Sequence, residues 1–577
     1  MDKKEYILKS LNDVQKNICK SEKNFILIAC PGSGKTRVIT HRLAYIVASN
    51  ENSQKLNIAL TYTNRAAKEI EKRIDEMNIN TSSIWTGTIH QFCLNFIIRP
   101  YSMYDEYLSK GYKIIDEYVE ELYYKKIAEE LNVKYKYVNE LYENEIVISE
   151  FKKSLIKNKE INFDMILELS LKLLTNHNFI SENISNIIRS IHVDEYQDTN
   201  EKQYLILSEL IKSNLNINIL FVGDINQAIY SNIGGIAKSS KEIKELFPIN
   251  FEEITMSKCY RSTQRIIDYY SHFELFKTNS ISNSNDKDDV GTISYNFNIT
   301  KENLAFHISK IIKDKLNEGL PEYEICIVAP QWQLMFPIAN KLRELLPNNN
   351  FDAPDISPIK YDPLNPFYLI AKLLFTKNSK YTSLRRKEAK EILSILIEDY
   401  RLDIPDYISN LDVLKILNKV NINKNDALKT IDDAFNSIIK VFKLENEKNF
   451  IESKCYFIQK INERMLKYEF SNTTNIFENS FKEKNGIVIS TLHGIKGEEY
   501  NTVIGYGLLT GYVPHWNYIY KSILKSKKID ESKKLLYVLC SRAKKHLFLF
   551  SETGRKTKTK NDYEPTDEIK KVSFLYD

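Results

Sequence analysis

The sequence predicts an α/β protein with two parallel-sheet domains, each interrupted by a mainly helical segment. With 577 residues, the chain is too long for a single hydrophobic core. Short apolar runs occur in two sets along the chain, and such runs are typical of buried parallel strands. None of the sixteen glycines lies between positions 320 and 485. This absence favours helices there, because glycine is used where the backbone must bend sharply.

The first sheet domain is predicted from four apolar runs. "NFILIA" (24–29) precedes a glycine loop and a segment with helical spacing, "KTRVITHRLAYIV". "LNIALTYT" (56–63) alternates, and a helix with one apolar face is expected to follow it. "SIHVDEYQD" (190–198) and "NINILFVGD" (216–224) each end on acidic residues, as parallel strands do at their carboxyl-terminal tips.

The second sheet domain is predicted from a later set of runs: "EICIVAP", "GIVISTLH", "TVIGYGL" and "HLFLFS". Segments of mixed helical character interrupt both sets. The expected boundaries are 1–94 and 156–256 for the first sheet domain, 95–155 for its insertion, 257–379 and 481–577 for the second, and 380–480 for its reduced helical insertion.

Composition narrows the cellular setting. The chain has 81 basic and 76 acidic residues, a net charge of +5, which is compatible with nucleic acid without arguing for it. Seven cysteines are scattered without a C-x-x-C pair, so neither a zinc site nor an iron–sulfur cluster is suggested and a reducing compartment is expected. No apolar run approaches the ~18 residues of a membrane helix. We expect a cytoplasmic protein without membrane contact.

The stretch "LIACPGSGKTRVIT" predicts a phosphate-binding loop, although Ala29 stands where the general pattern has glycine. In the G-S-G segment, Gly32, Ser33 and Gly34, the glycines let the backbone curl so that several N–H groups face one phosphate. Lys35 would reach the outer phosphates and Thr36 would bind magnesium. A chance glycine turn before a basic helix is the alternative, and the strand before the intact G-S-G-K-T argues against it.

A second motif supplies adjacent carboxylates. In "VDEYQD", Asp194 can hold magnesium while Glu195 takes the proton of the attacking water. Buried strand ends often carry one acid, so the D-E pair alone would leave both interpretations open. The following Tyr196, Gln197 and Asp198 favour the catalytic one.

With these motifs in place, the chain resembles the UvrD/Rep-type superfamily 1 (SF1A) DNA helicases, from about residue 11 to about residue 550. "LNDVQ" looks like the Q motif and "ACPGSGKT" like the family's own P-loop, which has alanine at its first position. "TYTNRAAKEI", "GTIHQFC", "VDEYQDTN" and "VGDINQAIY" resemble motifs Ia, Ib, II and III. "KCYRST", "TLHGIKGEEY" and "LLYVLCSRAKKHLFL" resemble motifs IV, V and VI. The resemblance implies two RecA-like P-loop domains, 1A and 2A, with insertions 1B and a short 2B.

The resemblance also implies roles in using ATP and Mg²⁺. Gln15 would read adenine, Tyr260 would stack on it and Glu499 would hold the ribose. Gln227 would sense the γ-phosphate, and Arg261 and Arg542 would be arginine fingers from the second sheet domain. Such arginines stabilise charge on the transferring phosphoryl group. Outside this series of motifs, either arginine would more often be an ordinary surface residue.

Polar and aromatic residues of four motifs match the family's DNA path. Single strands are bound by aromatic platforms beside a polar, basic groove, and Tyr62 keeps an aromatic ring at a base-contacting position. Taken singly, the polar residues would more often be helix caps or strand-end groups. The full predicted DNA-binding set is Tyr62, Thr63, Asn64, Thr88, His90, Thr491 and His493.

The match weakens at specific positions. Asn232 and Ile233 replace an aromatic and an arginine of motif III, and loss of a stacking ring can weaken DNA binding by ~1–3 kcal/mol. Cys30, Cys259 and Glu498 depart from the usual glycine, asparagine and leucine. The ATPase core is therefore better supported than vigorous unwinding.

The function we expect is an ATP-dependent DNA translocase or helicase, moving 3′ to 5′ on single-stranded or tailed DNA. RNA is a less favoured substrate. The short insertion at 380–480 resembles the GajB helicase-like subunits of Gabija antiphage systems. About 35 residues follow Arg542, so a nuclease (GajA-like in that case) is expected on a separate chain. The alternatives are a DNA-sensing ATPase that regulates a nuclease without unwinding, and a P-loop scaffold without turnover.

Overall fold

The computed structural model forms two compact units made of alternating stretches of the chain. The first comprises Met1–Ile97, Ser170–Asp352 and Lys484–Asp577, and the second comprises Ile98–Leu169 and Ala353–Glu483. The structure describes residues 3–50, 53–77, 79–115, 117–136, 138–229, 237–353, 357–360, 362, 365–377, 382–468, 470–481, 486–521, 525–557 and 559–577.

The first unit contains a six-stranded parallel sheet of order β3-β2-β6-β7-β1-β8. Four of its strands are the apolar runs predicted from the sequence. Neighbouring strands align buried aliphatic residues, as where Leu27 lies opposite Val222. The strands are β1 (Asn24–Ala29), β2 (Leu56–Thr61), β3 (Ile84–Thr88), β6 (Ile188–Asp194), β7 (Asn218–Gly223) and β8 (Phe251–Met256).

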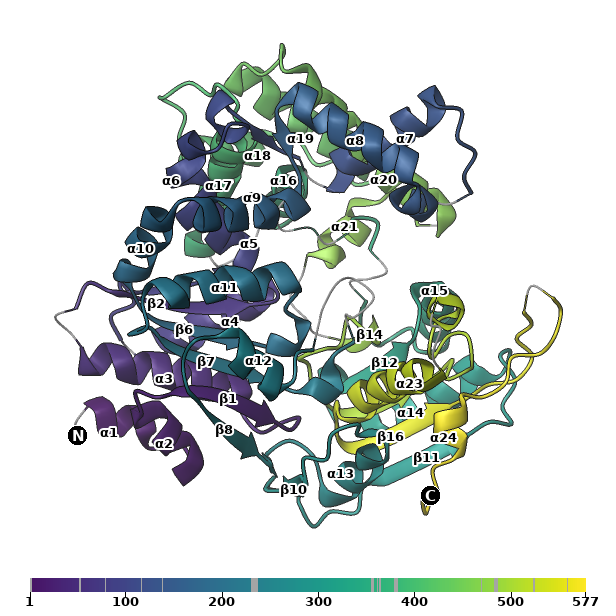
Figure 1. Cartoon of the computed structure of the whole chain (residues 1–577). Coiled ribbons are helices and arrows are strands. Elements are labelled where there is room, and N and C mark those ends of the chain that lie inside the picture. Colours follow the sequence, from purple (N-terminus) through teal and green to yellow (C-terminus); the bar gives the residue numbers. More distant parts are fainter. Residues whose placement is uncertain are drawn as a thin grey trace. The chain divides into compact units, whose positions relative to one another are not determined.

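Helices cover both faces of this sheet, which explains why its strands are apolar on both sides. From β1 the chain first runs outward to β2 and β3 on one side, and it then returns through β6 and β7, which fill the positions between β2 and β1, to β8 on the other side of β1. Right-handed crossovers then put α3 (Lys35–Ser49) and α11 (Glu201–Ser213) on opposite faces (Figure 1). Because all strands are parallel, the loops that follow β1, β6 and β7 gather at one edge.

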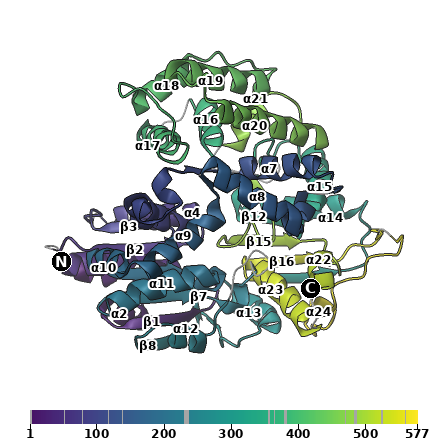
Figure 2. The ribbon, with the colours of Figure 1, turned by 45° about the horizontal axis from the view of Figure 1, so that its top comes forward.

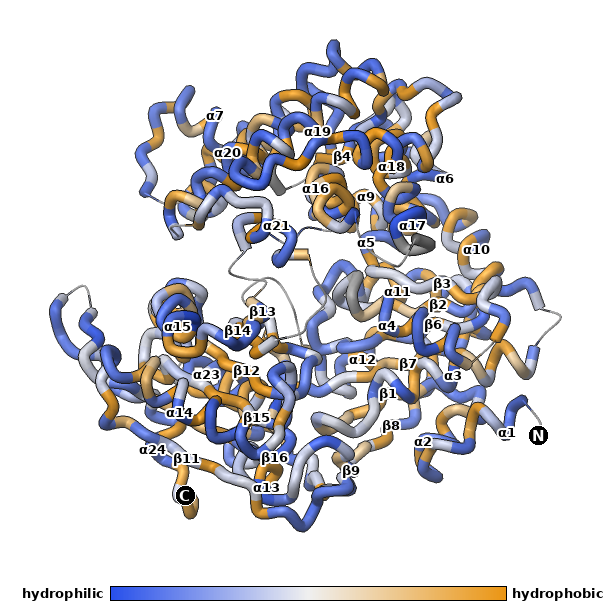
Figure 3. Tube along the Cα trace, turned by 180° about the vertical axis from the view of Figure 1, so that it is seen from behind, coloured by the Kyte–Doolittle hydropathy of each residue, from blue (hydrophilic) through white to orange (hydrophobic). Residues whose placement is uncertain are grey.

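A second six-stranded parallel sheet has the order β11-β16-β15-β12-β14-β13. Together the two sheets confirm the predicted α/β class. Hydrophobic stretches mark the strands of both sheets (Figure 3). The second sheet is built from β11 (Thr292–Asn296), β12 (Ile325–Ala329), β13 (Phe351–Asp352), β14 (Ile487–Thr491), β15 (Tyr500–Gly505) and β16 (Ala543–Phe550).

The other elements of the first unit connect and cover the sheets. A short pair, β9 (Lys258–Cys259) and β10 (Ile281–Ser282), follows the last strand of the first sheet. The main helices are α1 (Lys3–Leu8), α2 (Asp13–Lys20), α4 (Asn64–Asp75), α5 (Ile89–Phe92), α10 (Asn178–Ile187), α12 (Ser240–Leu246), α13 (Gln264–Tyr270), α14 (Leu304–Asn317), α15 (Trp332–Leu345), α22 (Trp516–Lys521), α23 (Lys525–Cys540) and α24 (Asp567–Lys570).

The second unit is mainly helical. Its aromatic core centres on Phe367, which stacks on Phe450 with ring centroids 4.9 Å apart. Helices α16 to α21 gather in one cluster (Figure 2). Its elements are α6 (Arg99–Tyr101), β4 (Lys113–Ile114), α7 (Glu117–Glu130), α8 (Glu145–Asn158), β5 (Glu160–Ile161), the first half of α9 (Phe163–Asn176), α16 (Pro366–Phe375), α17 (Thr382–Ser394), α18 (Asn410–Lys419), α19 (Ala427–Phe442), α20 (Lys448–Lys467) and α21 (Thr474–Ser480).

Ion pairs join the two stretches of chain within this second unit. Arg99 contacts Glu398 at 2.7 Å, and Lys126 contacts Glu452 at 2.9 Å. The unit also takes in residues 156–169 and 353–379, which the sequence boundaries placed with the sheet domains. Among the described residues, no helix combines the length and apolar character needed to cross a membrane.

Candidate active site

The glycine loop connects β1 to α3 in a conformation that depends on its glycines. Gly32 and Gly34 have φ angles of 71° and 86°, in the left-handed region that side chains disfavour. A Cβ on Gly32 would lie 2.5 Å from the Cβ of Arg261. Ser33 turns inward, donating from its hydroxyl to the carbonyl of Cys30 at 2.7 Å. The loop thus presents the amino terminus of α3, which favours anions.

Helix α2 supports the loop from one side. Asn12 and Gln15 form a reciprocal cap at its start, and Nε2 of Gln15 donates to the carbonyl of Ser33 at 3.1 Å. Nδ2 of Asn12 donates to the hydroxyl of Tyr260 at 2.7 Å. Tyr260 also donates its backbone N–H to the carbonyl of Gly32 at 2.8 Å. The two predicted adenine contacts, Gln15 and Tyr260, therefore lie beside the same loop.

Lys35, the first residue of α3, pairs with the acid motif. Its Nζ lies 3.1 Å from Oε1 of Glu195, and both side chains are mostly buried. Burial opposes charge on Lys35, yet the carboxylates around it raise its pKa. Burial likewise acts to raise the pKa of Glu195, but Lys35 and Lys496 lower it below the usual range. Glu195 is therefore ionised at neutral pH and held by a lysine of the loop.

Glu195 itself has an unusual backbone conformation, with φ 49° and ψ 48°. A residue with a Cβ rarely adopts this left-handed region, and doing so costs ~1–2 kcal/mol. Its N–H donates to Oδ1 of Asp194 at 3.0 Å. Strained residues of this kind cluster at functional sites, where the surrounding structure maintains them.

Other acids crowd the same strand tips. Burial and the neighbouring Glu195 raise the pKa of Asp194, and burial raises that of Asp224, the residue after β7. Gln197 links the two strands, donating to Glu195 and accepting from the N–H of Asp224 at 3.0 Å. Asp224 and Gln197 were absent from the predicted site. The signal for Asp224 was its place at the tip of an apolar run.

The donor chemistry here suits magnesium. Among the described residues, no group of three or more His, Cys, Asp or Glu side chains could hold a metal. Mg²⁺ is commonly held by one or two carboxylates together with substrate phosphates. Asp194 and the hydroxyl of Thr36, in the first turn of α3, fit that pattern. The crowding of carboxylates around Asp194 gives a reason for a cation to bind there.

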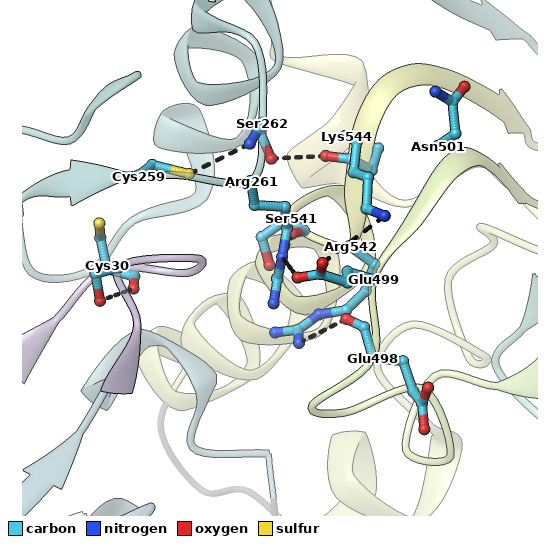
Figure 4. Close-up of polar contacts among 12 residues, drawn as sticks. Cys30, Cys259, Arg261, Ser262, Glu498, Glu499, Asn501, Ser541, Arg542 and Lys544 are labelled. Carbon is cyan, nitrogen blue, oxygen red and sulfur yellow. Dashed lines mark hydrogen bonds and ion pairs between the residues drawn. The ribbon is translucent and has the colours of Figure 1, made fainter. Parts of the chain in front are cut away.

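Two arginines approach these acids from the second sheet's part of the unit. Arg542, 2% exposed, donates from Nη2 to Oε1 of Gln227 and from Nη1 to the carbonyl of Glu498 at 3.3 Å. Gln227 in turn donates to Oδ2 of Asp224 at 2.6 Å. Arg261 contacts Glu499 and the carbonyl of Ser541 (Figure 4). The predicted polar sensor and arginine finger, Gln227 and Arg542, are thus in direct contact.

A buried lysine, missed in the sequence, makes a second connection. Nζ of Lys496 lies 2.5 Å from Oδ2 of Asp198 and donates to the carbonyl of Gln227 at 2.8 Å. Both charged side chains are nearly inaccessible, at 7% and 1% exposure. A buried pair needs such close partners to offset desolvation. The lysine inside "TLHGIKGEEY" was the available signal, but a lone lysine does not identify its partner.

The predicted DNA-binding residues lie at strand ends and helix starts. Tyr62 follows β2 and is 41% exposed. Thr63 and Thr88 cap α4 and α5, accepting the N–H groups of Ala66 and Gln91. The capping interpretation is therefore correct for both threonines, and their contact with DNA stays a prediction.

The remaining members of that set are partly described. His90 lies in α5, and Thr491 ends β14 and accepts the N–H of Gly494 at 3.1 Å. Burial and Lys496 lower the pKa of His493. The side chain of Asn64 lies outside the described residues, as do Asn232 and Ile233.

Two of the departures from the family pattern meet inside the site. Cys30 and Cys259 are both fully buried in the same apolar cluster. Sγ of Cys259 accepts the N–H of Ser262 at 3.5 Å (Figure 4), so the thiol makes a local contact to the motif. Burial raises the pKa of Cys30 to about 12. The thiol of Cys30 is therefore neutral, and both cysteines serve as packing groups in this cluster.

Known families match this chain over most of its length. A model described as the UvrD/REP helicase N-terminal domain matches residues 11–146 and 126–248. A model of the UvrD-like helicase C-terminal domain matches residues 367–553.

Individual relatives align almost end to end. The ATP-dependent DNA helicase PcrA of Bacillus subtilis (strain 168) is 26% identical over 638 residues, covering 94% of this chain and 83% of that protein. PcrA of Staphylococcus epidermidis (strain ATCC 12228) is 23% identical, covering 95% and 84%. PcrA of Staphylococcus aureus (strain NCTC 8325) is 24% identical with the same coverage.

Proposed function

The chain belongs to the UvrD/REP helicase family, and we propose that it is an ATP-driven motor that moves 3′ to 5′ on single-stranded DNA. The observation that carries this proposal is the contact between Arg542 and Gln227. It joins a cation of the second sheet's half to Gln227 of the first, which donates in turn to the carboxylate of Asp224. Hydrolysis that requires both halves makes ATP turnover depend on their approach, as a translocating motor needs.

The chemistry we assign follows from the side chains at the loop. The glycine loop and Lys35 bind the phosphates, and phosphate charge displaces Lys35 from Glu195. Glu195, already ionised, then accepts the proton of the attacking water. Magnesium, when bound by Thr36 and Asp194, neutralises phosphate charge. Arg542 and Arg261 stabilise the charge that builds on the transferring group.

ATP hydrolysis with and without single-stranded DNA tests this function. Lys35→Ala should lower turnover by about 100- to 1,000-fold, because one preorganised cation is lost. Lys23→Ala is the matched control. Lys23 lies just before β1 and pairs with Glu252 at 2.9 Å on the surface, so its loss should leave turnover unchanged. Unaltered ATP hydrolysis in Lys35→Ala would contradict the role of Lys35, whereas absence of hydrolysis in the unaltered chain would support a scaffold without turnover.

We further propose that the motor works with a separate nuclease, within a repair or antiphage defence complex. What supports this is the resemblance of the short 380–480 insertion to helicase-like subunits that act with such a partner. The test is copurification of the tagged chain and assay of the eluate for DNA cleavage. Recovery of the chain alone, without nuclease activity, from cells of its source would contradict it.

A second candidate function is a DNA-sensing ATPase that regulates the nuclease without unwinding. Asn232, standing where the family has a stacking aromatic, favours it because the grip on DNA is weakened. Strand displacement on a 3′-tailed duplex, measured beside DNA-stimulated ATP turnover, separates the two. Turnover without displacement, with the partner present, would exclude the helicase and support the sensor.

A further inference from the structure

Arg261 is held by a carboxylate of its own half of the site. Its Nε donates to Oε2 of Glu499 at 2.8 Å, and its Nη1 donates to the carbonyl of Ser541 at 3.0 Å. The arginine side chain is 9% exposed, whereas that of Glu499 is 49% exposed. The carboxylate is therefore half exposed to solvent while it binds the arginine, a contact that Figure 4 shows.

Glu499 has little other support. Nζ of Lys544 lies 3.7 Å from its Oε1, but the same ammonium is 3.0 Å and 3.2 Å from the two oxygens of Glu324. Lys544 is thus engaged mainly elsewhere. Burial opposes ionisation of Glu499, but Arg261 above all holds its pKa below the usual range. Arg261 is the principal partner of this carboxylate, so any group that competes for Glu499 acts on Arg261.

A bound nucleotide would bring such a group close. The backbone N–H of Tyr260, the residue before Arg261, donates to the carbonyl of Gly32 in the phosphate loop at 2.8 Å. Glu499 is therefore linked through Arg261 and Tyr260 to the loop, and a nucleotide whose phosphates bind the loop would bring its sugar to this side of the site. The sugar carries two hydroxyl donors, and a half-exposed carboxylate is a strong acceptor for them.

We propose that Glu499 is a positioning residue that keeps Arg261 away from the phosphates until the sugar hydroxyls of the bound nucleotide engage its carboxylate. This inference rests on the proposed ATP hydrolysis. Release is a change of partners without covalent chemistry. The carboxylate exchanges the guanidinium for two hydroxyls, and the guanidinium exchanges the carboxylate for phosphate oxygens. An ATP-shaped ligand without hydroxyls would bind the loop but leave the arginine held.

The experiment compares ATP with 2′,3′-dideoxy-ATP, in the presence of single-stranded DNA. For the unaltered chain, kcat should be about tenfold lower with the dideoxy nucleotide, because a charge-assisted hydrogen bond must break without compensation. In Glu499→Ala, kcat should be the same for both nucleotides, because no carboxylate is left to hold Arg261 or to bind the sugar, and KM for ATP should rise. Equal kcat values in the unaltered chain would overturn the proposal. So would a tenfold difference between the two nucleotides that persists in Glu499→Ala, because the sugar would then act through a group other than this carboxylate.

Two further variants serve as controls for this experiment. Glu318→Ala is the matched control, since Glu318 (56% exposed) pairs at 2.9 Å with Lys315 (9% exposed), the same kind of pair outside the site. It should keep the tenfold difference between nucleotides. Arg261→Ala should abolish that difference at a low overall kcat, and a persisting difference would show that Glu499 does not act through Arg261. Absence of any ATP turnover in the unaltered chain would contradict the proposed function as well. Turnover at the same rate with ATP and with the dideoxy nucleotide would contradict this inference alone.

Discussion

The first sheet contributes mostly carboxylates to the candidate site, whereas the second contributes cations. Asp194, Glu195 and Asp224 crowd the tips of β6 and β7, and burial disfavours the charge of each. On the other side, burial and then the nearby charge of Arg261 lower the pKa of Arg542. Each half therefore concentrates charge of one sign in a place where water does not screen it.

The two halves use different internal partners to neutralise part of this charge. In the first, Lys35 neutralises Glu195, and in the second, Glu499 neutralises Arg261. Only two charged side chains reach across, Arg542 to Gln227 and Lys496 to Asp198, among the residues for which the structure gives contacts. The internal pairs neutralise charge within each half without the other half. The crossing contacts form only when the two halves are together.

Removing a crossing arginine should have the largest effect. Arg542→Ala is expected to lower ATP turnover by about 1,000-fold or more, as loss of an arginine finger does, with ATP binding retained. Steady-state kinetics and titration with a fluorescent ATP analogue measure the two quantities. Arg265→Ala is the control, because Arg265 pairs with Asp577 at 2.8 Å away from the site and should affect thermal stability alone. Turnover near normal in Arg542→Ala would break the division into two interdependent halves.

Removing the proton acceptor of the first half comes next. Glu195→Gln should lower turnover by about 100- to 10,000-fold, the range of general base catalysis. ATP should bind at least as tightly as before, because a carboxylate near the phosphates is neutralised while the shape is kept. Equilibrium dialysis beside single-turnover hydrolysis checks both. If binding were lost along with turnover, Glu195 would serve the loop's structure and not the chemistry.

The second crossing contact should matter more for stability. Lys496→Ala leaves Asp198 buried without its cation, which should lower the free energy of unfolding by about 3 kcal/mol near neutral pH. Burial raises the pKa of Asp198 to about 6 even beside Lys496, and losing the lysine raises it further. As pH falls, protonation of Asp198 removes its uncompensated charge in the variant. The loss in free energy of unfolding relative to the unaltered chain should therefore be smaller at about pH 5 than at about pH 8. Chemical denaturation at both values checks this sign, and a deficit that grows at low pH would contradict it.

The outer ion pairs of the second half should matter least. Lys544→Ala removes a side chain that is 30% exposed and pairs with Glu324 at 3.0 Å. Because water screens such pairs, the free energy of unfolding should change by less than about 1 kcal/mol. Thermal unfolding measures the change. A loss as large as that of Lys496→Ala would mean that position relative to the site, and not burial, sets the cost.

Sequence patterns located the parts of the site that depend on local structure. The strand runs, the glycine loop and the acids at Asp194 and Glu195 follow from short-range periodicity and turn chemistry, and the structure confirms both parallel sheets. The side-chain pairs between residues far apart in the sequence could not be predicted in this way. Asp198 and Lys496 are 298 positions apart, and nothing in either segment identifies the other as its partner. The same applies to Arg261 and Glu499, whose proximity arises only when the sheet has formed.

Glu195 illustrates how stability and activity can oppose each other at one position. Its left-handed backbone is one that glycine would adopt without penalty. Glu195→Gly should therefore relieve local strain while deleting the proposed base, and Lys35 would keep the neighbouring carboxylates of Asp224 and Asp194. Libraries of this chain selected only for thermal resistance would tend to lose the residue on which turnover depends. A screen that couples heat challenge to ATP hydrolysis would keep it.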